Sequence, residues 1–230
     1  VIMIKRLIFD VDGTLITNVK LSEAITKALR KIGIYSEENL RRFLQAITTY
    51  EQTYNNYNRK DYLYHFSLAL QTQLPQDFID IFFKELKLVI PSENDKIQQT
   101  ISKLSKQYEL VLLTNYFKES QLNRLNNMGI GSFFIECYGE ESIKPNKEAY
   151  LMACGKNHPS ECVMIGDSVA LDIIPAQNLH LKTIFVDSMQ NNKLNISSMS
   201  VRTVNQINNR LIENLEDKEK NEQKKNGFIN

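Results

Sequence analysis

The sequence predicts an α/β fold, in which a doubly wound parallel sheet carries an inserted α-helical unit. Three features of the chain predict it: short apolar runs of strand length recur, helical patterns separate the later runs, and one long stretch shows helical periodicity alone. Nearly continuous apolar runs are typical of strands that are buried on both faces, as they are in parallel sheets. Strands that alternate with helices favour crossover connections over hairpins.

Five apolar runs are the candidate strands of the sheet. They span Leu7–Phe9, Leu110–Leu113, Phe133–Ile135, Val163–Ile165 and Thr183–Val186. The helical patterns that separate the later runs are Lys118–Met128, Lys147–Gly155 and Leu171–Leu179. We expect these helices to cover both faces of the sheet. The segment from Asp187 to Ser200 is polar and rich in Asn and Ser, and we expect an irregular connection there.

The stretch of residues 18–90 breaks the alternation because it contains only helical patterns. Four follow one another: Leu21–Ile32, which stops at Gly33, Leu40–Ile47 behind Ser36, Tyr62–Ala69, and Phe78–Leu86 behind Pro75. We therefore predict an α/β core domain of residues 1–17 and 91–215 and a helical cap domain of residues 18–90. Residues 216–230 begin with a run of mixed charge and form a flexible or helical tail in this division.

The composition restricts the partners of the protein. The 230 residues carry a net charge of +1, so no strong field over the whole molecule would attract nucleic acid or an anionic membrane. No run approaches the roughly 18 apolar residues of a membrane span. Three cysteines without close paired spacing are typical of reduced thiols. We expect a cytoplasmic monomer or homodimer that acts on a small metabolite and binds neither nucleic acid nor membrane.

Two carboxylates follow the first candidate strand. Asp10 and Asp12 come directly after Leu7–Phe9, and Gly13–Thr14 favours a turn there, so both side chains can face the crevice at the end of the strand. An ionised Asp is a nucleophile toward phosphorus and forms an aspartyl-phosphate. A second carboxyl group can protonate the leaving oxygen and later deprotonate the attacking water, an effect worth roughly 10²- to 10⁴-fold. For the pair alone, a solvated turn is an equally good interpretation.

A second pair of carboxylates follows the run Val163–Ile165. Asp167 lies just behind that run, and Asp172 lies in the helical pattern that comes next. Mg²⁺ is held by a few carboxylate oxygens together with waters and substrate phosphate. Asp10, Asp167 and Asp172 offer such an oxygen-rich corner. Taken alone, the second pair is also typical of an ordinary strand-to-helix turn with an Asp near the start of the helix.

Two further segments supply groups for a phosphate. Thr114 and Asn115 follow the run Leu110–Leu113, and Lys144 stands ahead of Pro145. A hydroxyl group, neighbouring backbone N–H groups and a point charge are suited to phosphate oxygens. Thr-Asn and Lys-Pro pairs are common and indicate nothing separately. The order of all four segments along one chain indicates a phosphoryl-transfer site.

In identity, order and spacing, the four segments resemble the motifs of the haloacid dehalogenase superfamily, in its branch of phosphatases with a helical cap. The resemblance extends over about residues 4 to 187. It implies a Rossmann-like core, Mg²⁺ as the cofactor and a cap that closes over the substrate. It also implies that Asp10 is the nucleophile and that Asp12 is the general acid and base.

The same resemblance implies the roles of the remaining residues. Thr114, Asn115 and Lys144 would bind phosphate. Asp10, Asp167 and, through its backbone carbonyl, Asp12 would hold Mg²⁺, and Asp172 would support that metal site.

Asp12 favours phosphate chemistry over carbon–halogen chemistry, because dehalogenation needs no acid to protonate an alkoxide. Dehalogenases of the superfamily generally lack this second Asp. The predicted function is that of a Mg²⁺-dependent phosphoric monoester hydrolase acting on a small phosphorylated metabolite, such as a sugar phosphate or a nucleotide. Two alternatives stay open: a phosphomutase of the β-phosphoglucomutase type, which shares every catalytic residue, and a non-catalytic phosphate-binding or scaffold protein.

The cap is rich in tyrosines and also carries cations. They are Tyr50, Tyr54, Tyr57, Tyr62 and Tyr64, with Arg41, Arg42, Arg59 and Lys60. The helical spacing of the first three tyrosines favours packing between helices, and the cations favour a solvated face. The sequence does not tell which of them face a substrate.

Overall fold

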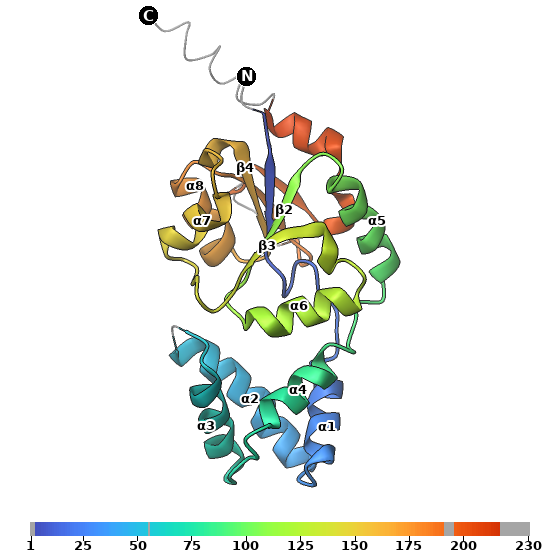
Figure 1. The fold of residues 1–230 in the computed structure, drawn as a ribbon, viewed down its shortest axis with the longest axis vertical. Helices are drawn as coiled ribbons and strands as arrows, with labels where there is room; N and C mark the ends of the chain where they lie inside the picture. The colour runs from blue at the N-terminus through green and yellow to red at the C-terminus, as the bar shows by residue number, and fades with distance from the viewer. Residues whose placement is uncertain (1–2, 55, 191–195, 217–230) are drawn as a thin grey trace, which may run out of the picture.

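Six parallel strands form one sheet in the computed structural model, which describes residues 3–54, 56–190 and 196–216. The strands are β1 (Arg6–Phe9), β2 (Glu109–Leu113), β3 (Phe134–Tyr138), β4 (Cys162–Gly166), β5 (Lys182–Val186) and β6 (Met199–Val201). Their order is β3-β2-β1-β4-β5-β6 (Figure 1). The chain leaves β1 on one side toward β2 and β3, and returns to its other side with β4. Sheets of this kind bind ligands in the crevice at that reversal, outside the carboxyl ends of the strands.

The strand residues point alternately to the two faces of the sheet, and helices cover both faces. The covering helices are α5 (Asn94–Leu104), α6 (Lys118–Asn127), α7 (Lys147–Cys154) and α8 (Ile174–Asn178). Leu7 and Phe9 pack in one apolar cluster with α5 and α6, whereas Ile8 between them packs with α7 and α8 (Figure 1). Burial on both faces is the physical reason for the uninterrupted apolar runs of the sequence.

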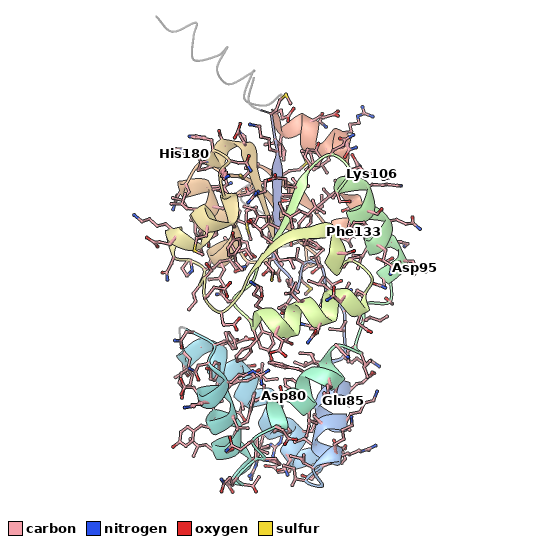
Figure 2. All side chains as sticks on the ribbon, in the orientation of Figure 1. Asp80, Glu85, Asp95, Lys106, Phe133 and His180 are labelled. Carbon is pink, nitrogen blue, oxygen red and sulfur yellow. The ribbon has the colours of Figure 1, made fainter. Side chains whose placement is uncertain are left out.

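The inserted residues form a helical unit with an apolar core of its own. Its helices are α1 (Leu21–Lys31), α2 (Glu37–Thr53), α3 (Arg59–Leu70) and α4 (Phe78–Leu86). Phe43 of α2 stacks on Phe66 of α3, with ring centroids 4.0 Å apart, and meets Phe78 and Phe82 of α4 edge-on. Figure 2 shows the side chains of this unit, with Asp80 and Glu85 labelled on α4. The four expected helices are present, and the domain boundaries at residues 17 and 91 stay a prediction.

Three elements differ from the expectations. Strand β6 lies in the segment that we expected to be irregular, and it extends the edge of the sheet by pairing with β5. Helix α5 was not predicted, although Ile97, Ile101 and Leu104 recur at helical spacing and are buried. The expected helix at Leu171–Leu179 is instead a π-helical turn, Val169–Ile173, followed by the short helix α8.

Residues 209–216 are helical, and the predicted tail beyond Glu216 lies outside the described residues. All three cysteines are free thiols. Within the described ranges, we find no helix with the length and apolar character that a membrane crossing requires.

Candidate active site

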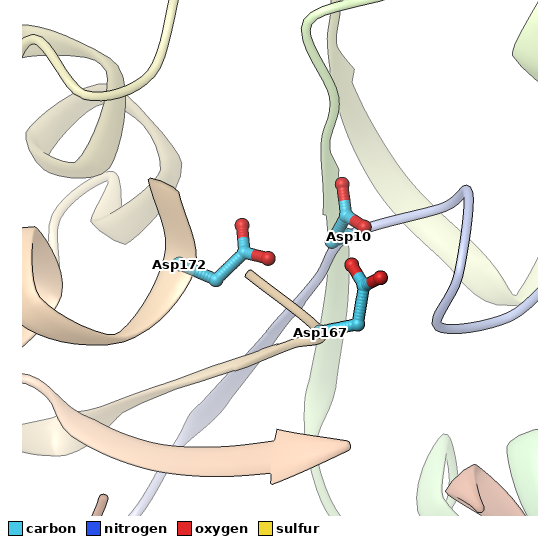
Figure 3. A group of neighbouring side chains, drawn as sticks. All are labelled: Asp10, Asp167 and Asp172. Atoms are coloured by element: carbon cyan, nitrogen blue, oxygen red, sulfur yellow. The ribbon is translucent and has the colours of Figure 1, made fainter. Parts of the chain in front are cut away.

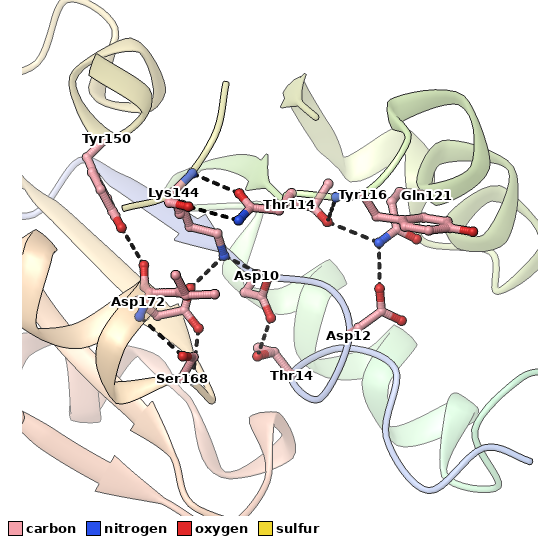
Figure 4. Close-up of polar contacts among 12 residues, drawn as sticks. Asp10, Asp12, Thr14, Thr114, Tyr116, Gln121, Lys144, Tyr150, Ser168 and Asp172 are labelled. Atoms are coloured by element: carbon pink, nitrogen blue, oxygen red, sulfur yellow. Dashed lines mark hydrogen bonds and ion pairs between the residues drawn. The ribbon is translucent and has the colours of Figure 1, made fainter. Parts of the chain in front are cut away.

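Asp10 is the first residue beyond β1, and its carboxylate is buried and held from two sides. Its backbone N–H donates to Ile165 O of β4 at 2.9 Å, which fixes it at the reversal of the strand order. Oδ1 of Asp10 accepts a hydrogen bond from Lys144 Nζ at 2.9 Å, and Oδ2 accepts one from the Thr14 hydroxyl at 3.2 Å (Figure 4). Both contacts orient the carboxylate that the sequence predicts to be the nucleophile. Thr14 was not singled out from the sequence.

Lys144 is the cation at the centre of the site. Its Nζ lies 2.9 Å from Asp10 Oδ1 and 2.6 Å from Asp172 Oδ1, and its side chain is only 3% exposed. The side-chain amide of Asn115 forms two hydrogen bonds with the backbone of Lys144. Asn115 Oδ1 accepts from Lys144 N at 2.8 Å, and Asn115 Nδ2 donates to Lys144 O at 2.9 Å. These contacts occupy both polar atoms of the Asn115 side chain. Asn115 therefore positions Lys144, and phosphate binding by Asn115 stays a prediction.

The buried charges change the proton affinities of these groups. Burial raises the pKa of Asp10 to about 8, against the opposing attraction of Lys144, and the charge on Asp172 adds to the rise. Burial alone would lower the pKa of Lys144, but the charges of Asp10 and Asp172 raise it overall. Burial and the charge on Asp172 also raise the pKa of Asp167. Three carboxylates thus share one ammonium group, and the site has excess negative charge.

The three carboxylates converge on one point. Asp10, Asp167 and Asp172 each place an oxygen within 4.8 Å of the others (Figure 3). Gly13 makes room for this group: it has a positive φ of 82°, and a Cβ atom there would lie 2.1 Å from Asp167 Oδ2. An all-oxygen donor set with uncompensated negative charge fits a hard divalent cation such as Mg²⁺.

The three carboxylates of this cluster differ in their other contacts. Asp172 is already occupied, since Oδ1 contacts Lys144 and Oδ2 accepts from Ser168 N at 2.9 Å. Its contacts suit the supporting role that was predicted for it. Asp12 contributes no side-chain oxygen to the cluster, and its expected metal contact through the backbone carbonyl stays a prediction.

The Asp12 carboxylate is instead clamped by two residues of α6. Asp12 Oδ1 accepts from Arg124 Nη1 at 2.7 Å, and Oδ2 accepts from Gln121 Nε2 at 2.7 Å. Gln121 Nε2 also donates to the Thr114 hydroxyl at 3.1 Å (Figure 4). The Arg124 side chain is 4% exposed and that of Asp12 is 55% exposed, so a buried cation holds a carboxylate that faces the solvent-accessible pocket.

Thr114 keeps a donor for the pocket. Its hydroxyl oxygen accepts from Gln121 Nε2 and from Tyr116 N at 3.3 Å, so the hydroxyl hydrogen remains to be donated to a ligand. Sequence reasoning missed Gln121 and Arg124. The only signal was their i, i+3 spacing on one face of a helix.

A pocket of about 640 Å³ opens above these groups. The core lines it with Asp10, Asp12, Thr114, Asn115, Tyr116, Ile143, Lys144, Pro145, Asn146, Asp167, Ser168, Leu171 and Asp172. The helical unit adds Glu51, at the end of α2, with Tyr54 and Tyr57 just behind it. The predicted site residues therefore surround one pocket, and the end of α2 forms its opposite wall.

Residues 4–180 match the profile of the haloacid dehalogenase-like hydrolase family. The chain belongs to this family. Two curated relatives of this hydrolase are each named glyceraldehyde 3-phosphate phosphatase. The protein from Methanopyrus kandleri is 27% identical over 202 residues, which are 79% of this chain and 83% of the relative. The protein from Methanothermobacter thermautotrophicus is 25% identical over 203 residues, which are 81% and 87% of the two chains.

Solved structures share the fold of the hydrolase. The HAD-hydrolase YfnB from Bacillus subtilis, solved with magnesium bound, has a TM-score of 0.67 at 19% identity, covering 88% of this chain and 96% of that one. A HAD phosphatase from Thermococcus onnurineus has a TM-score of 0.63 at 22% identity, with coverage of 87% and 94%. A 2-haloacid dehalogenase from Pseudomonas syringae has a TM-score of 0.65 at 20% identity, with coverage of 89% and 96%. The predicted family and its Rossmann-like α/β fold are confirmed.

Most of the tyrosines and cations that the sequence offered in the helical unit do not line the pocket of this hydrolase. Tyr50 is buried among aromatic rings, as its spacing predicted, and so is Tyr62, whereas Tyr64 is 62% exposed. Arg41 and Arg42 both form ion pairs with Glu38, and Arg59 pairs with Asp80 and Glu119. Lys60 lies outside the pocket lining as well.

Proposed function

We propose that this hydrolase is a Mg²⁺-dependent phosphatase that cleaves the phosphate ester of a small metabolite through an aspartyl-phosphate on Asp10. The observation that carries the proposal is a buried Asp10 carboxylate, oriented by Lys144 and Thr14 at the base of a pocket whose rim presents Asp12. The names of the two curated relatives, both phosphatases of a small phosphorylated aldehyde, support it.

The first half of the reaction transfers the phosphoryl group to the enzyme. Asp10 attacks phosphorus, the bond between phosphorus and the ester oxygen breaks, and Asp12 gives a proton to the departing oxygen. In the second half, Asp12 takes a proton from a water molecule that attacks the phosphorus. The bond from Asp10 to phosphorus then breaks, and inorganic phosphate leaves.

The other groups of the site bind and orient the phosphate. Lys144 and the free hydroxyl hydrogen of Thr114 contact phosphate oxygens in this proposal, while Asn115 holds the backbone of Lys144. Asp10 and Asp167 hold Mg²⁺, which, when bound, supplies positive charge against the phosphate oxygens and the clustered carboxylates. Asp172 keeps Lys144 beside Asp10.

Asp12 is the reason to favour phosphate esters over halogenated acids. An alkoxide leaving group needs a proton, whereas a halide does not, so a general acid beside the nucleophile is needed only in the first case. The likeness to dehalogenase structures is below 25% identity and concerns the fold.

The direct test measures phosphate release from an aryl phosphate with Mg²⁺, with a chelator, and with an Asp10→Asn variant. We expect release that needs both the metal and Asp10. Phosphate release from a panel of phosphorylated metabolites then shows which leaving groups the enzyme prefers. Metal-independent release, or full activity of the Asp10→Asn variant, would contradict the proposal, and isomerised ester without free phosphate would indicate a mutase.

A further inference from the structure

The wall of the pocket opposite the catalytic groups carries a carboxylate that the mechanism does not use. Glu51 lies near the end of α2, is exposed to the pocket, and is followed by Tyr54 and Tyr57 in the lining. Burial raises the pKa of Glu51, and the charge on Asp12 raises it further, while a hydrogen bond from Tyr57 opposes the rise. Glu51 and Asp12 thus act on each other across the pocket.

The charges of the lining are strongly one-sided. Among the described residues that line the pocket, Lys144 carries the only positive charge, and it is paired with Asp10 and Asp172 at the base. Arg124 is buried against Asp12 and does not line the pocket. Arg41, Arg42 and Arg59 of the helical unit form ion pairs elsewhere, as described above. The outer half of the pocket therefore offers carboxylates, phenols and amides.

The proposed mechanism implies an orientation for a bound ester. Its phosphate lies at the base with Lys144, and its bridging oxygen lies toward Asp12. The rest of the substrate then extends toward Glu51 and the two tyrosines. In that space, hydroxyl groups find acceptors, whereas a second anionic group meets the carboxylate of Glu51, and no described residue in that part of the lining carries a positive charge.

We infer that Glu51 is a specificity-determining residue, which accepts hydrogen bonds from a neutral, hydroxyl-bearing leaving group and rejects leaving groups that carry a second negative charge. The inference rests on the proposed phosphatase function and names the substrate class of the same site. Rejection by an unpaired like charge is a common way in which proteins discriminate between ligands of equal size.

Two esters that differ at one end test the inference. Glycerol 3-phosphate carries a hydroxymethyl group where 3-phosphoglycerate carries a carboxylate. We expect kcat/KM with Mg²⁺ to be higher for glycerol 3-phosphate by at least about tenfold in the unaltered protein. The Glu51→Gln variant should reduce this ratio at least about threefold, and Glu51→Lys should reverse the preference.

Glu37→Gln is the matched control. It removes the same charge from the exposed first turn of the same helix, about 20 Å from Glu51 at 1.5 Å per residue, and should leave the ratio unchanged. Where turnover of either ester is too slow to measure, inhibition constants of both esters against an aryl phosphate give the ratio of their affinities, for which we expect the same direction of change.

The outcomes separate this inference from the proposed function. Asp10-dependent hydrolysis with a ratio that Glu51→Gln does not change, or a preference of the unaltered protein for 3-phosphoglycerate, overturns the role of Glu51 alone. Absence of Mg²⁺-dependent hydrolysis of every ester, including the aryl phosphate, contradicts the proposed function instead.

Discussion

Two regions form opposite walls of one pocket by different physical means. One is the carboxyl end of the sheet in the core, here called the strand edge, and the other is the helical unit. At the strand edge, Asp10, Lys144 and Asp172 are buried polar groups, and each has fixed partners. In the helical unit the core is apolar and rich in aromatic rings, such as Phe43 and Phe66. Among its described residues, those that line the pocket lie at the end of α2 and just behind it.

Because of this difference, we expect the two walls to control different properties, the rate of reaction and the choice of substrate. A polar cluster tolerates few changes, because each member leaves a buried charge unpaired when its partner is removed. An exposed helix end tolerates many changes, because its side chains have few obligatory partners. We therefore expect variants of the strand edge to change the rate of the chemical step and variants of α2 to change the choice of substrate.

The largest expected effect comes from the proposed nucleophile. Asp10→Asn removes the group that attacks phosphorus in the proposed mechanism and should lower kcat on an aryl phosphate by about 10⁴-fold or more. The variant should stay folded by circular dichroism, since the change removes a charge whose burial is unfavourable. A loss of less than tenfold would show that the strand edge is not the site of chemistry.

The metal site gives the next largest effect. At about 100 times its dissociation constant, Mg²⁺ should stabilise the protein by about 2.7 kcal/mol, which raises Tm by about 5 to 10 °C. Asp167→Asn should abolish this shift and, without metal, should melt above the unaltered protein, because it removes one of three clustered charges. Thermal melts with Mg²⁺ and with chelator measure both. If Mg²⁺ raised the Tm of the variant as much as that of the unaltered protein, Asp167 would not be a metal ligand.

The contact between Arg124 and Asp12 tests the proposed role of Asp12 as the general acid. Arg124→Met should lower kcat about 10- to 100-fold on an alkyl phosphate but less than about threefold on an aryl phosphate, because only the alkoxide needs the proton of Asp12. Combined with Asp12→Asn, it should cause little further loss. Arg59→Met, which removes an exposed cation of the helical unit, is the control. Equal losses on both esters would assign Arg124 a structural role only.

The smallest expected effect concerns the ion pair that joins the two regions. Arg59 of α3 lies 2.8 Å from Glu119 of α6, and both side chains are largely exposed. Glu119→Gln should cost less than about 1 kcal/mol, seen as a small change in Tm that disappears at high salt. Aromatic contacts between the regions, such as Tyr57 with Tyr116 at 5.1 Å, should hold them together. A cost above about 2 kcal/mol would contradict this assignment.

Candidate site residues were predictable where a reactive side chain directly follows a strand. Asp10 and Thr114 stand directly behind strands, and parallel strands bring their carboxyl ends to one edge, so sequence order alone places them together. Strand β6 was missed because its three residues carry no apolar run, and its pairing depends on the edge that β5 provides.

The partners of these residues were not predictable. Gln121 and Arg124 look like ordinary residues of a polar helix, and their contacts with Asp12 depend on how α6 packs on the sheet. Thr14 was predicted as part of a turn and Asn115 as a phosphate ligand. The hydrogen bonds of Thr14 to Asp10 and of Asn115 to the Lys144 backbone follow from the folded geometry.

The sequence by itself determined the fold class and the family, and it predicted the candidate reacting groups, since strand burial, helical periodicity and residue identity are local properties of the chain. Only the tertiary structure decided which face of the helical unit meets the pocket. In the folded protein, Arg42 and Arg59 form ion pairs away from the pocket, and Glu51 lies in the pocket wall opposite Asp12. That choice depends on how the aromatic core of the unit packs and docks against Tyr116 and Phe117, and such long-range packing leaves no periodic signal in the sequence.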